Sequence, residues 1–126
     1  MASHWRDEFG SEYEVPDVFL SGGLLDSSWH NDVCPSFMVP ELYEKIARSV
    51  EGDPDPEDIR VWVNHPDPKQ REFPDAPRFL VCTSSTGETL YEGENAEAAR
   101  AALEAASRLE LLRLYALEAA RKAGRQ

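Results

Sequence analysis

The sequence predicts an α+β protein: a small antiparallel sheet of three to four strands, packed by two helices in the order β-α-β-β-β-α. Three observations lead to this prediction. Residues 59–63 alternate between apolar and polar side chains, as a half-buried strand does. Residues 40–50 carry apolar side chains at helical spacing. Residues 96–123 contain neither glycine nor proline, which predicts one long C-terminal helix.

The first 35 residues predict an N-terminal arm packed on a single α+β domain formed by residues 36–126. This segment lacks sustained periodicity, but it holds five of the twelve aromatic residues of the chain: Trp5, Phe9, Tyr13, Phe19 and Trp29. Large rings are uncommon in disordered tails, so we expect the arm to be ordered against the domain. One helical turn is expected around residues 17–21, before the Gly22-Gly23 break.

The domain is expected to begin with a short strand at residues 36–39 and a helix whose first residue is Pro40. Apolar residues from Leu42 to Val50 form one stripe along this helix, and Gly52 is expected to end it. In the strand that follows, Ile59, Val61 and Val63 are expected to face the core.

A loop with four prolines, residues 65–77, then leads to a strand at 78–83. Residues 84–87 form a turn into a last strand at 88–92. Asn95 is a good N-cap for the C-terminal helix, which is expected to run to about Ala123. A helix of that length measures about 42 Å and should reach past the edge of the domain.

The charge of the chain is concentrated in its first half. Residues 1–58 hold 14 acidic and 3 basic residues, a net charge of −11, whereas residues 59–126 hold 10 of each. Like charges crowded together oppose a compact state, so this asymmetry suggests a face that meets a basic surface. The residues expected to bind such a partner are Glu41, Glu44, Glu51, Asp53, Asp55, Glu57, Asp58, Lys69 and Arg71. Phe73 is expected to tuck back onto the sheet, with a role as apolar anchor for the partner as the alternative.

The overall acidity narrows the classes of function. With a sequence pI of about 4.6, the protein is expected to repel nucleic acids and anionic membranes. We therefore expect a non-catalytic acidic protein that occupies a basic surface of a protein partner. One form would be a nucleic-acid-mimicking inhibitor from a phage or mobile element, of the anti-CRISPR or anti-restriction type. No leader or membrane span is evident, which predicts a cytoplasmic protein.

An alternative function is a small cysteine- or metal-dependent enzyme centred on His30, Asp32 and Cys34. Residues of these types supply a nucleophile, a base and an orienting group, but such groups normally converge from distant segments of a chain. The spacing matches no recognised metal motif, so no cofactor and no metal are expected. Cys34 and Cys82 are expected to be ordinary thiols rather than a disulfide.

From Pro40 onward, the expected order helix–strand–strand–strand–helix is similar to that of double-stranded-RNA-binding domains. Residues 98–103, Ala-Ala-Arg-Ala-Ala-Leu, also resemble the alanine-rich last helix of that family. The resemblance implies a shared topology. That family places lysines at the start of this helix to bind phosphates, whereas this chain has Glu94, Asn95, Ala96 and Glu97, so RNA binding is not expected.

A third reading is a structural homodimer formed through the last helix. Residues 109–117 are apolar nearly all around the helix, which requires partners on more than one side. The expected seam consists of Leu111, Leu114, Tyr115 and Leu117. Around it lie Glu110, Arg113, Glu118 and Arg121.

Overall fold

A computed structural model describes residues 5–29, 32–50 and 55–124 of the chain. Its strands form one antiparallel sheet in which spatial order follows chain order: β1 (Leu25–Asp26), β2 (Ser36–Met38), β3 (Ile59–Val63), β4 (Phe79–Thr83) and β5 (Thr89–Gly93). This confirms the predicted α+β class and adds a fifth strand. The additional strand is β1, which contains two residues within the arm, too few to produce a periodic pattern in the sequence.

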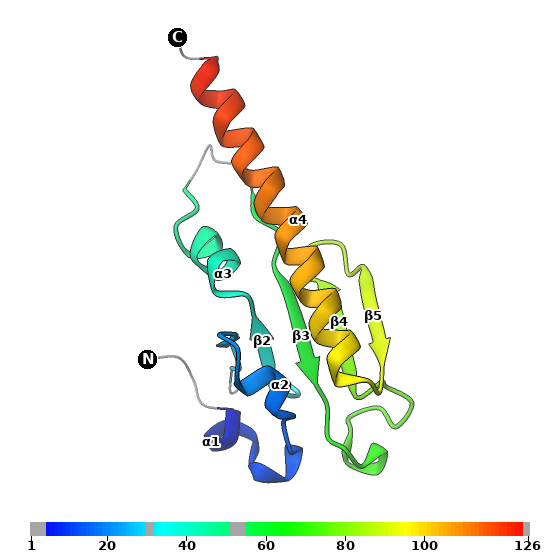
Figure 1. Cartoon of the computed structure of the whole chain (residues 1–126). Coiled ribbons are helices and arrows are strands. Elements are labelled where there is room, and N and C mark those ends of the chain that lie inside the picture. Colours follow the sequence, from blue (N-terminus) through cyan, green and yellow to red (C-terminus); the bar gives the residue numbers. More distant parts are fainter. Residues whose placement is uncertain (1–4, 30–31, 51–54, 125–126) are drawn as a thin grey trace.

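One helix covers a face of this sheet, and the helices of the first 50 residues gather along one side of it (Figure 1). The helical segments are α1 (Trp5–Phe9), η1 (Ser11–Tyr13), α2 (Asp17–Leu20), α3 (Pro40–Ala47), η2 (Pro68–Gln70) and α4 (Ala96–Ala123). α4 contacts β3, β4 and β5, and both α2 and α3 contact α4.

The long helix α4 begins and ends where the sequence predicts. The side-chain oxygen of Asn95 accepts a hydrogen bond of 2.9 Å from the backbone N–H of Ala98, which satisfies one free donor of the first turn. The buried side chains of α4 are Ala99, Leu103, Ser107, Glu110, Leu111 and Leu114. No residue from Tyr115 to Gly124 is buried, because this part of the helix extends past the sheet (Figure 1).

The arm contributes side chains to the centre of the hydrophobic core. Phe19 of α2 is completely buried, and its ring centroid lies 6.1 Å from that of Phe37 on β2 and 5.5 Å from that of Phe79 on β4. Ile59, Val61 and Val63 of β3 are buried as predicted. The irregular first part of the chain therefore belongs to the same core as the regular part.

Two arginines from the second half of the chain attach the arm through its backbone. The Arg100 guanidinium on α4 donates to the carbonyl oxygens of Ser21, at 2.7 Å, and Gly22, at 2.8 Å. The guanidinium of Arg78 donates to the carbonyl oxygen of Glu14 at 2.8 Å. Gly22 has a φ of +79°, and an added Cβ there would lie 2.8 Å from Arg100, so both the conformation and the close approach favour glycine.

Helix α3 ends earlier than expected, at Ala47 rather than near Gly52. Leu42 is buried and Ile46 is half-buried, whereas Val50, the next residue of the predicted apolar stripe, is exposed. Because tertiary packing supplies most of the stability of a short helix, a further turn whose apolar side chain is exposed gains little stability from packing.

We predict that Phe19→Ala lowers the free energy of unfolding by about 3–5 kcal/mol, because it leaves a cavity among Phe37 and Phe79. The matched control is Leu20→Ala, one residue along the same helix, where the side chain is exposed and the expected change is below about 0.5 kcal/mol. Denaturant unfolding measures both values. Equal effects of the two substitutions would show that the arm does not contribute to the core.

Candidate functional site

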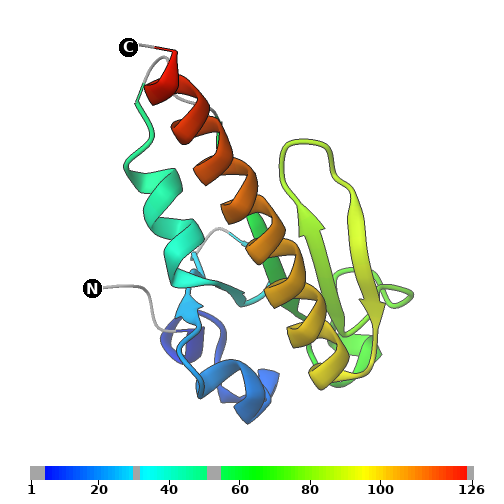
Figure 2. The ribbon, with the colours of Figure 1, turned by 45° about the horizontal axis from the view of Figure 1, so that its top comes forward.

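The acidic residues are unevenly distributed in space as well as along the sequence. Figures 1 and 2 both show residues 5–50 on one side of α4, with β4 and β5 on the other side. Most of the acidic first half therefore lies on one side of the molecule, whereas Glu57 and Asp58 lie beside the turn between β4 and β5, where they contact Ser85 and Ser84.

A dense group of exposed carboxylates lies on the arm and was not among the predicted partner-binding residues. Five acidic residues within eleven positions are all exposed: Asp7, Glu8, Glu12, Glu14 and Asp17. None of the ion pairs within the described part of the chain involves them. The clustering of these acidic residues in the sequence could have indicated an exposed acidic surface. The aromatic residues between them instead suggested only that the arm packs on the domain.

The predicted acidic cluster on and after α3 is mostly engaged within the molecule. Glu41 and Asp55 are exposed, whereas the Glu44 carboxylate lies 3.1 Å from Nε of Arg48. Asp58 accepts two hydrogen bonds from the guanidinium of Arg60, at 2.8 and 3.0 Å. Glu57 accepts a hydrogen bond from the Ser85 hydroxyl. Glu51 and Asp53 lie outside the described residues.

Glu110 and Arg113 hold the segment before β3 against α4. The Glu110 carboxylate accepts a hydrogen bond of 2.7 Å from the backbone N–H of Glu57, and Arg113 donates to it at 2.7 and 2.6 Å. Arg113 also donates to the carbonyl oxygen of Asp55 at 2.9 Å. The hydrogen bonds from Arg113 lower the pKa of Glu110, so this carboxylate stays ionised at neutral pH. Both residues were expected around a dimer seam, but here they act within one chain.

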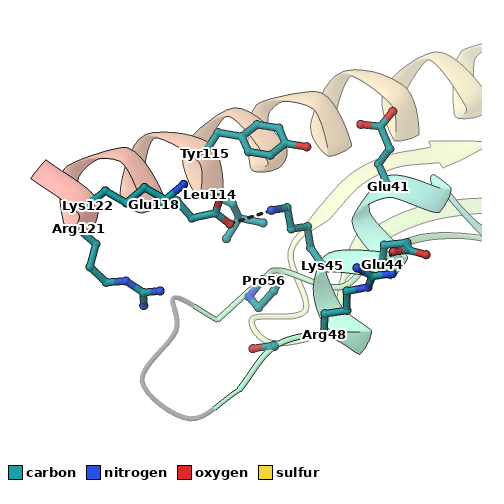
Figure 3. Close-up of a pocket in the computed structure, with 11 residues that line it drawn as sticks. Glu41, Glu44, Lys45, Arg48, Pro56, Leu114, Tyr115, Glu118, Arg121 and Lys122 are labelled. Carbon is teal, nitrogen blue, oxygen red and sulfur yellow. Dashed lines mark hydrogen bonds and ion pairs between the residues drawn. The ribbon is translucent and has the colours of Figure 1, made fainter.

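A groove of about 600 Å³ opens between α3 and the C-terminal part of α4 (Figure 3). Lys45 lies across it, with Nζ 2.8 Å from the Glu118 carboxylate and 4.7 Å from the ring centroid of Tyr115. Glu44 and Arg48 form a second pair on the α3 wall. The Lys45–Glu118 pair joins the two helices, and the groove is lined by charges of both signs, so it does not select a ligand of one sign.

The proline-rich loop at residues 65–77 is organised around Arg71. The Arg71 side chain is only 3% exposed, and its guanidinium donates to the carbonyl oxygens of His65 at 2.7 Å and Ala76 at 2.6 Å. Arg71 was expected to meet a partner, but burial removes it from the surface and gives it a structural role. Lys69, on η2 within the same loop, is exposed and remains a candidate for contact.

Phe73 lies at the surface of this loop, with 67% of its area exposed. The expectation that its ring tucks back onto the sheet is therefore wrong. The backbone of the loop turns at this point, because the N–H of Ala76 donates to the carbonyl of Phe73 at 2.9 Å, and Arg71 binds the carbonyls of His65 and Ala76 near the two ends of the loop. With the backbone so held, the ring is left pointing outward, as an apolar anchor requires.

Arm and loop meet at one end of the molecule. The Tyr13 ring contacts the His65 ring, with centroids 5.3 Å apart, and Arg78 donates to the Glu14 carbonyl. Figures 1 and 2 both place the arm and the loop toward the same end of the sheet. Two ordered segments, one with exposed carboxylates and the other with an exposed aromatic ring, are therefore in contact at this end of the molecule.

The geometry around Cys34 does not favour the enzyme alternative. Burial, with the nearby charge of Asp32, raises the pKa of the Cys34 thiol to about 12, so the thiolate that nucleophilic catalysis needs is scarce at neutral pH. His30 lies outside the described residues. Within the described part of the chain, no three His, Cys, Asp or Glu side chains form a group that could hold a metal ion. Cys34 and Cys82 are both free thiols.

The four residues of the expected dimer seam do not share one surface. Leu111 and Leu114 are buried in the core of their own chain, whereas Tyr115 and Leu117 are exposed. The inner face of this helical stretch packs against α3 and the sheet of the same chain. Only its outer residues are therefore available to another molecule.

We predict that Arg71→Ala destabilises the protein by about 2–4 kcal/mol, because it leaves buried carbonyl oxygens without donors. Lys69→Ala, in the same loop but exposed, is the control and should change stability by less than about 0.5 kcal/mol. Denaturant unfolding gives both values, and limited proteolysis reports opening of the loop. Similar values for the two variants would show that Arg71 does not organise the loop.

We also predict that Cys34 resists alkylation at neutral pH. In a Cys82→Ser background, the thiolate fraction of Cys34 should be about a thousandfold lower in the folded protein than in the unfolded chain, since its pKa is near 12 rather than 9. Mass spectrometry after iodoacetamide treatment, with and without denaturant, measures the difference. Because the pKa of Cys34 is higher in the folded protein, its contribution to the free energy of unfolding is complete below pH about 9. This contribution is lost as the pH rises toward 12. Rapid, complete modification of the folded protein would revive the cysteine-enzyme alternative.

Across residues 5–29, 32–50 and 55–124, no helix combines the length and apolarity that crossing a bilayer requires. Comparisons of the chain with protein-family models, with curated proteins and with solved structures find no match.

Proposed function

We propose that the protein is a non-catalytic binding protein that uses its acidic side to occupy a basic surface of a protein partner. One observation carries the proposal: the five carboxylates from Asp7 to Asp17 are exposed and form no ion pair within the described chain. A protein that needed only to fold would reduce this self-repulsion by mixing charges on its surface. Leaving the carboxylates unpaired favours an external partner that supplies the positive charge.

Glu41, Asp55 and Lys69 extend this contact surface, together with Glu51 and Asp53 outside the described residues. Phe73 adds the apolar component. Charge governs the rate and specificity of protein association, whereas a few buried aromatic residues supply most of its free energy. A rigid loop loses little conformational freedom on binding, and Arg71 together with four prolines gives the 65–77 loop this rigidity. The proposed partner is therefore basic and has an apolar pocket for one ring.

In its most specific form, the proposal is a nucleic-acid mimic of the kind that phages and mobile elements direct against CRISPR or restriction systems. Dense carboxylates on an ordered arm resemble the repeated negative charges of a phosphate backbone. Lys69 would then meet a carboxylate at the edge of the basic surface. Such a partner would itself bind nucleic acid, and DNA or RNA would compete with this chain for it.

The proposal predicts that charge on the arm, rather than total charge, controls partner capture. The test variant is Asp7→Asn/Glu8→Gln/Glu12→Gln, and the matched control is Glu88→Gln/Glu92→Gln/Glu97→Gln, which removes three exposed carboxylates near β5 and the start of α4. Immobilised wild-type protein should retain a specific protein from native lysate at low salt and release it at high salt. The arm variant should lose this capture, and the control should keep it.

Equal losses in both variants would indicate non-specific electrostatic retention and would contradict the proposal, as would undiminished capture by the arm variant. Adding duplex DNA or RNA to the capture reaction tests the nucleic-acid-mimic form. Competition would support it, and capture that is indifferent to nucleic acid would limit the function to binding another class of basic protein.

A further inference from the structure

One carboxylate of the arm is held against the backbone beside two aromatic residues. Gly10 links α1 to η1 with a φ of +92°, and a Cβ added there would lie 2.6 Å from Oε2 of Glu12. Glycine therefore provides the space that this carboxylate occupies. The rings of Phe9, before the link, and Tyr13, after it, pack edge to face with centroids 5.6 Å apart. Both rings are half-buried, so part of each remains accessible.

The Tyr13 ring is fixed in place by contacts within the chain. Besides Phe9, it contacts the ring of His65, with centroids 5.3 Å apart, and its hydroxyl donates to the carbonyl oxygen of Val33 at 3.3 Å. Burial raises the pKa of Tyr13, as does the nearby charge of Glu12, so the ring is a neutral phenol at physiological pH. A rigid aromatic surface and a carboxylate therefore lie together on the arm.

No cation of the described residues pairs with this carboxylate. Glu12 is exposed and takes part in none of the ion pairs of the described chain. The guanidinium of Arg78 approaches the arm, but it donates to two backbone carbonyls, at 3.3 and 2.8 Å. The guanidinium of Arg6, on the arm itself, lies over the Trp5 ring, 5.1 Å from its centroid. The carboxylate and the rings are therefore available to a cation from another molecule.

The same combination occurs elsewhere in the chain together with a guanidinium. Arg60 on β3 donates to both carboxylate oxygens of Asp58, at 2.8 and 3.0 Å. The guanidinium of Arg60 also lies 5.8 Å from the ring centroid of Trp62. The carboxylate holds the planar group by two parallel hydrogen bonds, and the aromatic face attracts its positive charge. The arm presents the same two components, a carboxylate and aromatic rings, at its surface.

We propose, on the basis of the proposed function, that an arginine of the basic partner docks on this part of the arm. Its guanidinium pairs with the Glu12 carboxylate and lies against the rings of Phe9 and Tyr13. Lysine carries a compact, strongly hydrated charge that neither pairs with both carboxylate oxygens in one plane nor stacks on a ring, so it binds this site more weakly. Selection of arginine lets the arm distinguish between basic surfaces of equal charge.

Nuclear magnetic resonance titration of the isotope-labelled full chain tests this selection. The probes are two blocked peptides of identical sequence, except that one carries arginine at every position where the other carries lysine. At low salt the arginine peptide should bind at least about threefold more tightly, because a cation–π contact adds to the ion pair. The largest shifts of backbone amide signals should fall within residues 9–13. Equal affinities, shifts centred outside the arm, or no binding of either peptide would overturn the selection of arginine.

Two charge-matched variants locate the contact. Glu12→Gln should abolish the preference for arginine, because the guanidinium loses the carboxylate that orients it. Glu8→Gln removes an equal charge from another exposed position of the arm. It should lower the affinity for both peptides alike and so keep the preference. Retention of the preference by Glu12→Gln, or its loss in Glu8→Gln, would refute this placement of the arginine.

Substitutions at Tyr13 test the part played by the ring. Tyr13→Phe keeps the aromatic face and removes only the hydroxyl, so the preference for arginine should stay within about twofold of wild type. Tyr13→Leu keeps an apolar side chain without an aromatic face and should weaken the preference. The spectra of both variants also report whether the arm remains folded. Equal preferences in the two folded variants would show that the ring does not contact the guanidinium.

These outcomes are distinguishable from those of capture from lysate. The peptides measure which cation the arm prefers, whereas capture measures whether the arm is the surface that binds the partner. Equal affinities for the two peptides would overturn the selection of arginine and leave the acidic side as the proposed binding surface. Undiminished capture by the Asp7→Asn/Glu8→Gln/Glu12→Gln variant would instead overturn the proposed function itself.

Discussion

The structure depends on guanidinium groups that bind backbone carbonyl oxygens across long stretches of sequence. Arg100 binds the carbonyls at the end of α2, Arg78 binds that of Glu14, Arg71 binds both sides of the proline-rich loop and Arg113 binds that of Asp55. These carbonyl oxygens lie in irregular and mostly exposed backbone, which does not satisfy its own polar groups as helices and sheets do, and the guanidinium donors fix its conformation. The planar guanidinium carries five N–H donors and can serve two or three carbonyls at once. In this way the neutral second half of the chain fixes the irregular first half in place.

This use of arginine also explains why the acidic side stays acidic. None of these four guanidinium groups forms an ion pair with a carboxylate of the arm. Arg71, Arg100 and Arg113 pair instead with Glu94, Glu104 and Glu110 of the second half, among the six ion pairs of the described residues. Arg78 and Arg100 attach the arm through its main chain, so the carboxylates of Asp7, Glu8 and Glu12 remain directed to solvent. The arm is therefore ordered and strongly charged at the same time. These two properties normally oppose each other, since like charges favour an extended chain.

Regular elements could be predicted from the sequence because their signals are local. Asn95 at the start of α4 and the alternation of Ile59, Val61 and Val63 each depend on a few adjacent residues. The burial of Arg71 and the exposure of Phe73 could not be predicted in this way, because they depend on how the irregular loop folds around the guanidinium and brings the carbonyls of His65 and Ala76 to it. The end of α3 was also missed, since the packing that supports another turn is a tertiary property. For the candidate site, the sequence showed the charge asymmetry between the two halves of the chain. It did not show which carboxylates would form ion pairs or hydrogen bonds within the molecule.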